Sequence, residues 1–190
     1  MSTKSALVTG GCGFIGSHLV DRLLALGYSV VVIDNLALGR KENIPFRHPR
    51  VTLIEKSLEN WEGLSEVVSG CDYVFHMAAL ADIVPSIEKP TDYFQANVVA
   101  TQQLVEACKN AKLKKFVYAA SSSCYGIPDT YPTSEGASMD PRYPYALTKL
   151  LGEQIVMHWS SVYGLPSISL RLFNVYGPRA RTNGTYGAMF

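Results

Sequence analysis

The chain alternates short, almost wholly apolar runs with longer segments in which apolar side chains recur every three or four positions. The short runs are rich in β-branched and aromatic residues and predict buried strands at residues 5–9, 28–34, 51–56, 72–78, 115–121 and 167–173. The longer segments predict helices at residues 14–26, 61–70, 92–112 and 145–164. Residues 126–144 are rich in turn-forming side chains and predict a long loop, which is often a functional feature.

The order of these elements indicates the fold class. Strands that alternate with helices form parallel sheets through right-handed βαβ units. We therefore expect an α/β fold, a Rossmann-type doubly wound parallel sheet. The sequence contains no internal repeat and no low-complexity stretch.

Composition and charge narrow the classes of function. The chain has 190 residues, 47% of them hydrophobic, and a net charge of +1. This length allows one well-buried domain, and the balanced charge favours neither nucleic acid nor a membrane surface as a partner. No apolar run reaches the roughly 18 residues that a membrane-spanning helix needs. Because the N-terminal sequence leads directly into the first predicted strand, we expect no signal peptide and a cytoplasmic protein.

The four cysteines, at positions 12, 71, 108 and 124, are scattered and form no CxxC pair. This spacing is typical of reduced thiols that act as small core residues rather than as metal ligands. We therefore predict no metal site.

The junction between the first strand and the first helix reads TGGCGFIG and places glycines at positions 10, 13 and 16. Gly10 allows a tight turn, Gly13 allows the main chain to approach a pyrophosphate, and Gly16 allows close packing of helix on strand. The start of the helix then offers N–H groups and a partial positive charge to phosphate groups. The pattern predicts a dinucleotide site.

An acidic residue, Asp34, ends the second predicted strand. A carboxylate at this place accepts hydrogen bonds from the adenosine ribose and opposes a 2′-phosphate, so NAD is favoured over NADP. Arg40 and Lys41 follow closely and could counter the acid, which keeps NADP as the open alternative.

A second group of polar residues lies about a hundred positions later. Serines at positions 121, 122 and 123 end the fifth strand, and the next helix opens with Tyr145 and Lys149, four residues apart on one face. A tyrosine with its ordinary pKa of about 10 is a poor base, but a neighbouring ammonium and the nicotinamide cation both favour its phenolate. A serine hydroxyl at the strand end can hold a substrate hydroxyl for proton transfer.

These residues carry a family resemblance. The chain resembles the extended short-chain dehydrogenases/reductases, in the group of NAD-dependent sugar epimerases and dehydratases, and is most similar to the nucleotide-sugar 4-epimerases. The matching motifs occur in the family's order and cover nearly the whole chain: TGGCGFIG, IDNLALGRKENI, HMAA, NVVAT, SSSCYG, YALTK and RLFNVYGPR.

The resemblance implies roles for individual residues. Tyr145 is the base, Lys149 binds the nicotinamide ribose and lowers the tyrosine pKa, and one of the three serines assists, with Ser121 at the family's position and Ser122 and Ser123 as alternatives. Further implied cofactor contacts come from Phe14, Ile15, Asn35, Ala78, Ala79, Asn97 and Phe173. Implied substrate contacts come from Ser123, Tyr145 and Asn174.

The chain departs from the family pattern in two places. Relatives carry an acid after the third strand that holds the adenine, and here Ser57 and Leu58 stand in its place. Relatives are also longer than 300 residues. We therefore assign residues 1–175 to an NAD-binding domain with the catalytic Ser, Tyr and Lys, and residues 176–190 to the start of a truncated substrate-binding region, the rest of that lobe being absent.

The branch of the family is indicated by a missing carboxylate. Dehydratases and decarboxylases of this group resemble one another in carrying an acid just after the catalytic serine or threonine, where this chain has Ser122, Ser123 and Cys124. A hydroxyl cannot act as the base for elimination at neutral pH. We therefore expect a 4-epimerase acting on a UDP-hexose or UDP-N-acetylhexosamine. The alternatives are a uronate epimerase, a dehydratase, a decarboxylase or a non-catalytic NAD-binding module. By the same resemblance we expect a homodimer that pairs through the helix at residues 143–163.

Overall fold

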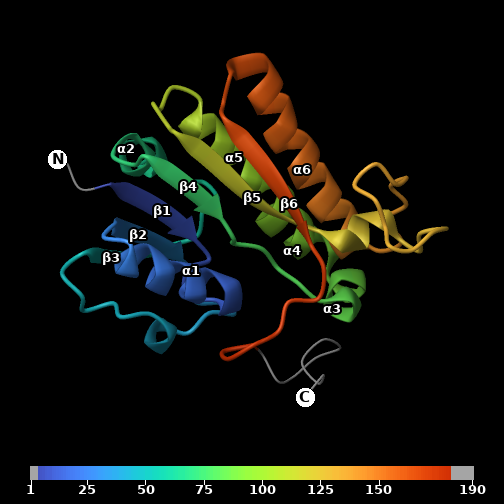
Figure 1. The fold of residues 1–190 in the computed structure, drawn as a ribbon, viewed down its shortest axis with the longest axis horizontal. Coiled ribbons are helices and arrows are strands. Elements are labelled where there is room, and N and C mark those ends of the chain that lie inside the picture. Colours follow the sequence, from blue (N-terminus) through green and yellow to red (C-terminus); the bar gives the residue numbers. More distant parts are fainter. Residues whose placement is uncertain (1–3, 181–190) are drawn as a thin grey trace.

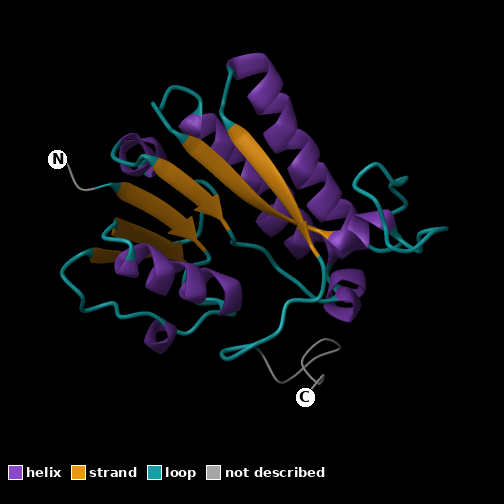
Figure 2. Cartoon of the chain, viewed as in Figure 1, coloured by secondary structure: helices purple, strands orange, loops and turns teal. Residues whose placement is uncertain are grey.

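A single parallel sheet runs through the computed structural model, which describes residues 4–180, and helices cover both of its faces (Figures 1 and 2). The strands lie in the order β3-β2-β1-β4-β5-β6, and every neighbouring pair is parallel. The direction in which strands are added reverses between β1 and β4, which is where open α/β sheets bind ligands. The strands are β1 (Ser5–Thr9), β2 (Ser29–Asp34), β3 (Val51–Glu55), β4 (Tyr73–His76), β5 (Lys115–Ser121) and β6 (Ser167–Leu172).

The helices connect successive strands, as βαβ units require. A long helical stretch between β4 and β5 consists of three consecutive segments, of which the middle one, η2, is a π-helix. The helices are α1 (Phe14–Ala25), η1 (Lys41–Asn43), α2 (Leu64–Ser69), α3 (Ile83–Glu88), α4 (Pro90–Phe94), η2 (Gln95–Val99), α5 (Ala100–Cys108), η3 (Ser122–Tyr125) and α6 (Pro144–Tyr163).

The two faces of the sheet form two separate cores. Helix α1 covers one face over β1 and β2, where Val8, Val20 and Val32 are fully buried. Helices α2, α5 and α6 cover the other face, where Leu7 and Phe116 are fully buried. Side chains of both faces are apolar along the central strands, as expected for a sheet buried on both sides.

The structure confirms the predicted fold class and places the six predicted strands and four predicted helices to within a few residues. It differs by adding α3 before the predicted start of the long helix and by containing the π-helical segment inside it. The stretch from Gly126 to Tyr143 contains no helix or strand, in agreement with the predicted long loop. Part of the region assigned to substrate binding, residues 181–190, lies outside the described residues.

The four cysteines are buried free thiols. Burial raises the pKa of Cys12 to about 12 and that of Cys71 to about 11, so both stay protonated at neutral pH. Within residues 4–180, no helix has the length and apolarity needed to cross a bilayer.

Candidate functional site

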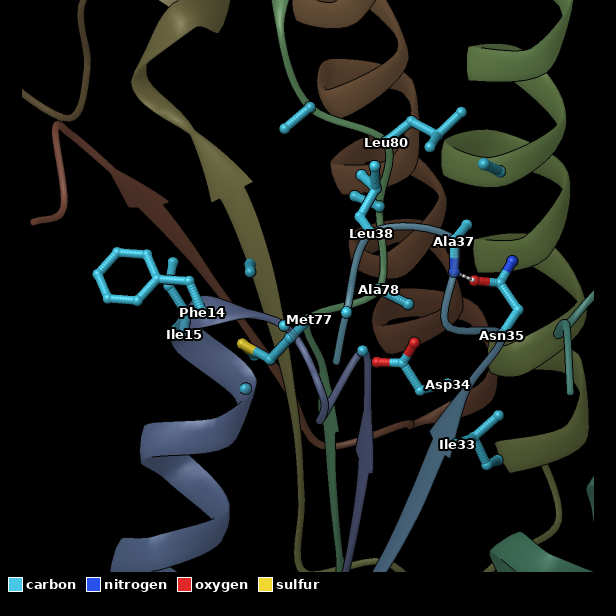
Figure 3. Close-up of a pocket in the computed structure, with 18 of the residues that line it drawn as sticks. Phe14, Ile15, Ile33, Asp34, Asn35, Ala37, Leu38, Met77, Ala78 and Leu80 are labelled. Carbon is cyan, nitrogen blue, oxygen red and sulfur yellow. Dashed lines mark hydrogen bonds between the residues drawn. The ribbon is translucent and has the colours of Figure 1, made fainter. Parts of the chain in front are cut away.

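A cavity of about 670 Å³ opens at the carboxyl ends of β1, β2 and β4, beside the start of α1 (Figure 3). It brings together most of the residues for which the sequence predicted cofactor contacts. These are Gly10, Gly13, Phe14, Ile15, Gly16, Asp34, Asn35, Ser57, Leu58, Ala78 and Ala79. The cavity therefore lies where the topology of the sheet and the glycine motif both predict a dinucleotide.

The three glycines of the turn differ in what they require. Gly10 has a φ of +65°, and a Cβ there would lie 2.7 Å from the Cα of Ala78, just after β4. At Gly16 a Cβ would overlap the carbonyl oxygen of Gly10. At Gly13 a Cβ would meet only that same oxygen, at 3.2 Å, so the space in front of Gly13 is open. Gly10 and Gly16 are thus needed by the fold, whereas Gly13 leaves room for a ligand beside the helix start.

Asp34 is held in the cavity wall by main-chain donors. Its Oδ2 accepts the N–H of Cys12 at 2.9 Å and its Oδ1 accepts the N–H of Leu36 at 2.8 Å. Only 7% of the residue is exposed. A carboxylate oxygen can accept two hydrogen bonds, so each keeps capacity for a ligand hydroxyl. Beside it, Asn35 accepts the N–H of Ala37 at 3.0 Å (Figure 3).

The two cations that follow Asp34 are placed differently. Lys41 forms an ion pair with Glu55 at the end of β3, so its charge is already balanced. Arg40 lines the cavity, and its main-chain N–H donates to the carbonyl oxygen of Cys12 at 3.0 Å. Of these two cations, Arg40 therefore remains near Asp34.

The wall after β3 contains an acid that the sequence reasoning missed. Ser57 and Leu58 line the cavity as predicted, but the Ser57 hydroxyl donates to the carboxylate of Glu59, which also lines it. The acid directly follows positions 57 and 58, at which relatives were expected to carry it. The segment after β3 has no regular structure, so residue counting could not identify this side chain in advance.

The predicted base and its partner lie at the start of α6. Tyr145 is in the first turn of the helix and is partly buried, with its ring edge-on to the ring of Tyr93 at 6.4 Å between centroids. One turn later Lys149 is 3% exposed, and its ammonium lies 4.3 Å from the centroid of the Tyr118 ring. Burial lowers the pKa of Lys149 to about 8, so the ammonium is still the majority form at pH 7. A buried cation therefore stands one turn from the tyrosine.

The serine triplet is divided by the structure. Ser121 ends β5 and caps η3, and its Oγ lies 2.7 Å from the Oγ of Ser123 and accepts the Ser123 N–H at 3.2 Å. Ser122 begins η3 between them. Ser121 and Ser123 therefore form one hydrogen-bonded hydroxyl pair at the strand end.

Asn97 is buried in the π-helical segment and connects two parts of the site. Its side-chain amide accepts the N–H of Leu80 at 2.8 Å and donates to the carbonyl oxygen of Leu80 at 3.0 Å. It also donates to Thr148 Oγ1 at 3.0 Å, next to Lys149 on α6. Asn97 lies outside the lining of the cavity, and its side chain instead joins the segment after β4 to α6.

The residues after β6 take positions that the sequence did not indicate. Phe173 and Asn174 are exposed and lie outside the lining of the cavity; the Phe173 ring stacks on Tyr125 at 6.5 Å between centroids. Arg179 lines the cavity instead and donates to Asp21 on α1 at 2.5 Å and to the carbonyl oxygen of Asn43 at 3.0 Å. The motif RLFNVYGPR was the one signal for this arginine.

Comparison with known proteins gives consistent matches. A family model, described as the NAD dependent epimerase/dehydratase family, matches residues 6–190. The chain is 40% identical to the UDP-N-acetylglucosamine 4-epimerase of Methanobrevibacter ruminantium M1, solved with UDP-N-acetylmuramic acid, with a TM-score of 0.93 over 100% of this chain and 61% of that one. It is 38% identical to the UDP-glucose 4-epimerase of Thermus thermophilus, solved with NAD, with a TM-score of 0.88 over 96% of this chain and 59% of that one.

A relative with a different activity is nearly as similar. The UDP-N-acetyl-alpha-D-glucosaminuronate decarboxylase of Bacillus cytotoxicus is 34% identical over 98% of this chain and 59% of its own length. The chain thus spans about three fifths of the length of each of these relatives.

Proposed function

Because the chain belongs to the NAD-dependent epimerase/dehydratase family, we propose that it forms the cofactor-binding and catalytic part of a nucleotide-sugar 4-epimerase. The observation that carries the proposal is the pairing of Tyr145 and the buried Lys149 with a strand end that bears only hydroxyl and thiol side chains.

The cavity fits NAD, the cofactor of this family. The open space before Gly13 at the start of α1 suits a pyrophosphate, and the fixed Asp34 carboxylate suits a ribose diol. NAD supplies reversible hydride transfer at its nicotinamide ring when it is bound. Because Lys41 is paired with Glu55, Asp34 and Arg40 are the charges that face each other at the ribose end.

Side chains of this protein then remove and return the proton of the sugar hydroxyl. The Tyr145 phenolate accepts the proton of the sugar 4-hydroxyl, and the ammonium of Lys149 one turn away stabilises the negative charge on the phenolate. The hydrogen-bonded pair of Ser121 and Ser123 can orient the same sugar hydroxyl. When the sugar is reduced again, Tyr145 returns the proton.

The side chains of η3 determine the fate of the oxidised sugar. Elimination of water requires a base just after the serine, and η3 has Ser122, Ser123 and Cys124 there, with the thiol of Cys124 buried and its pKa raised by that burial. The 4-keto form of a hexose, which has no carboxyl group to lose, is then reduced again, and reduction on its opposite face gives the 4-epimer. The similarity to UDP-sugar enzymes supports UDP-hexose or UDP-N-acetylhexosamine as substrate.

Decarboxylation is the second candidate, favoured by the similarity to the decarboxylase of B. cytotoxicus. It would need a UDP-uronate as substrate, since only a uronate carries the carboxyl group that leaves after oxidation at C4.

A homodimer belongs to the same proposal. Helix α6 exposes the apolar side chains of Leu147, Met157 and Val162, which a second copy of the helix could cover. Sedimentation equilibrium of the chain and of its Met157→Glu variant tests this, with a dimer expected for the first and a weaker dimer for the second. A monomer at all concentrations would contradict it.

The function is tested by product analysis with the longest natural polypeptide that contains this chain. We expect nuclear magnetic resonance to show conversion of UDP-glucose or UDP-N-acetylglucosamine into its 4-epimer, and no conversion by the Tyr145→Phe variant. Carbon dioxide released from a UDP-uronate would instead establish the decarboxylase, and a 4-keto-6-deoxy sugar a dehydratase. Tight NAD binding without turnover of any of these sugars would favour the non-catalytic module.

A further inference from the structure

A histidine that no step of the proposed reaction uses is completely enclosed beneath the site. His76 ends β4 and is 1% exposed. Its Nδ1 lies 2.7 Å from Thr9 Oγ1 at the end of β1, and its Nε2 lies 2.9 Å from Thr101 Oγ1 on α5. Both ring nitrogens therefore have a threonine hydroxyl as partner, one on β1 and the other on α5.

The neighbours of the two threonines determine where the protons are. Thr101 donates its single hydroxyl proton to the carbonyl oxygen of Asn97 at 2.6 Å, so it must accept from His76 at Nε2. The imidazole is neutral because burial, assisted by the charge of Lys149, lowers its pKa to about 3. With the proton on Nε2, Nδ1 is an acceptor and receives the hydroxyl proton of Thr9.

Each end of this arrangement reaches the candidate site. On one side Thr9 Oγ1 accepts the N–H of Ala78 at 3.2 Å, and Ala78 lines the cavity. On the other side Thr101 donates to the main-chain carbonyl oxygen of Asn97, and the side chain of Asn97 forms hydrogen bonds with Leu80 and Thr148.

The last link reaches the helix of the predicted base. Thr148 receives a hydrogen bond from Asn97 and donates its own proton to the carbonyl oxygen of Tyr145 at 2.9 Å. Each threonine hydroxyl in these links donates its single proton once, so the hydrogen bonds can all form at the same time. The order of the links is Ala78, Thr9, His76, Thr101, Asn97, Thr148 and Tyr145.

We infer that His76 is a positioning residue, which fixes the cavity wall at Ala78 relative to Asn97. Through Asn97 it also fixes the helix that carries Tyr145. A neutral histidine suits this place because one ring offers an acceptor and a donor on opposite edges. The inference deepens the proposed function and rests on it only for the consequence in turnover; the links themselves are a property of the folded chain.

Three substitutions at His76 separate the two bonds. His76→Phe keeps a ring of similar size and removes both bonds. His76→Asn can keep an acceptor near the place of Nδ1, and His76→Gln can keep a donor near the place of Nε2. The matched control is Val74→Ala, which lies on the same strand and the same face, is fully buried, and belongs to none of the links.

The first readout is hydrogen exchange of the 190-residue chain without any ligand, which does not depend on the proposed function. We expect the amides of Ala78 and Leu80 to exchange at least about tenfold faster in His76→Phe, measured relative to the amide of Val32 in β2, because a buried partner is lost. Val74→Ala should leave both ratios unchanged. Unchanged ratios in His76→Phe would overturn the inference.

The second readout is NAD affinity by calorimetry. We expect His76→Phe to weaken binding about tenfold, His76→Asn to restore most of it, and His76→Gln to restore less, because only the bond to Thr9 reaches Ala78. An equal loss in Val74→Ala would show that His76 contributes general stability only. If the unaltered chain binds no NAD, the proposed function fails, while the exchange experiment still tests the links.

A further variant keeps the test valid if the substitutions at His76 prevent folding. Thr101→Val is nearly the same shape and interrupts only the side of the links that leads to Asn97. We expect faster exchange at Leu80 and unchanged exchange at Ala78. Equal acceleration at both amides would contradict the order of the links.

Discussion

Gly152 on α6 packs so closely against Tyr118 on β5 that a Cβ atom at position 152 would overlap the tyrosine hydroxyl and lie 3.0 Å from its Cζ. The same Cβ would lie 3.1 Å from the carbonyl oxygen of Asn97. The helix of the predicted base is therefore seated directly on the sheet and on the π-helical segment. Gly152→Ala should lower the free energy of unfolding by about 1–3 kcal/mol, measured by urea denaturation. Gly136→Ala is the control: no atom lies within 4 Å of the added Cβ, so we expect no loss of stability. Equal effects would contradict the packing.

The glycine turn should separate folding from binding. Gly16→Ala places a methyl group against the carbonyl oxygen of Gly10 and should destabilise the chain by about 1–3 kcal/mol. Gly13→Ala meets one atom at 3.2 Å and should change stability less, yet it occupies the open space before α1 and should weaken NAD binding about tenfold. Thermal unfolding and calorimetry of both variants check this. A Gly13→Ala variant with normal NAD affinity would place the pyrophosphate elsewhere.

Substitutions of Tyr145 and of Lys149 should differ in their effect on NAD affinity. Tyr145→Phe should leave NAD affinity within about threefold and lower turnover of the longest natural polypeptide by about 10²–10⁴-fold, the usual contribution of a general base. Lys149→Met should reduce both, because the roles proposed for its ammonium are to contact the nicotinamide ribose and to stabilise the Tyr145 phenolate. More than about a tenth of the activity remaining in Tyr145→Phe would exclude the base role.

Acid should destabilise the chain partly through His76. The pKa of His76 falls from 6.5 to about 3 on folding, so between these values the unfolded chain binds the proton and the folded chain does not. Stability contributed by the neutral ring is therefore complete above about pH 6.5 and is lost as the pH falls, by up to about 1.4 kcal/mol per pH unit. Urea denaturation at about pH 7.5 and about pH 4.5 should show a smaller loss in His76→Asn than in the unaltered chain. Parallel losses would show that His76 titrates normally.

Charge at the ribose end of the cavity should set the choice of cofactor. The unaltered chain should bind NAD more tightly than NADP, because the Asp34 carboxylate opposes a 2′-phosphate. Asp34→Asn should reduce this preference at least about tenfold, whereas Glu59→Gln, which removes an equal charge from another wall of the cavity, should leave it unchanged. Calorimetry with both cofactors measures the ratio. Tighter binding of NADP by the unaltered chain would mean that Arg40 outweighs Asp34.

Local patterns in the sequence predicted those parts of the molecule that local physics controls. The apolar runs predicted the strands, and the glycine spacing and Asp34 predicted much of the cavity lining, because a strand–turn–helix unit is set by neighbours in sequence. Helix α3 was missed because it is short and contains Pro85, which weakens any helical pattern. It also follows Asp82, a non-glycine residue with a φ of 93°.

Other features depend on residues far apart in the chain. The bond between Thr9 and His76 joins positions 67 residues apart, and the ion pair of Arg179 with Asp21 joins positions 158 apart. The periodicity of the sequence cannot predict such pairs, because the two partners lie in different elements and only the assembled sheet brings them together. The catalytic roles of Ser121, Tyr145 and Lys149 and the division of the chain at residue 175 stay predictions.

The π-helical segment Gln95–Val99 has a consequence for comparing this chain with its relatives. The N–H of Ala100 bonds to the carbonyl oxygen of Gln95, five residues back, so the segment holds one residue more than an α-helix of equal rise. Deletion of one residue within 95–99 would convert the segment to an α-helix, and the side chains of α4 and α5 would keep the faces they now present. Losing one within α5 would rotate every later side chain of that helix by about 100° and turn Leu104 or Cys108 away from the core. When this chain is aligned with a relative that is one residue shorter here, the gap therefore belongs at positions 95–99, inside the helix, although gaps are ordinarily assigned to loops.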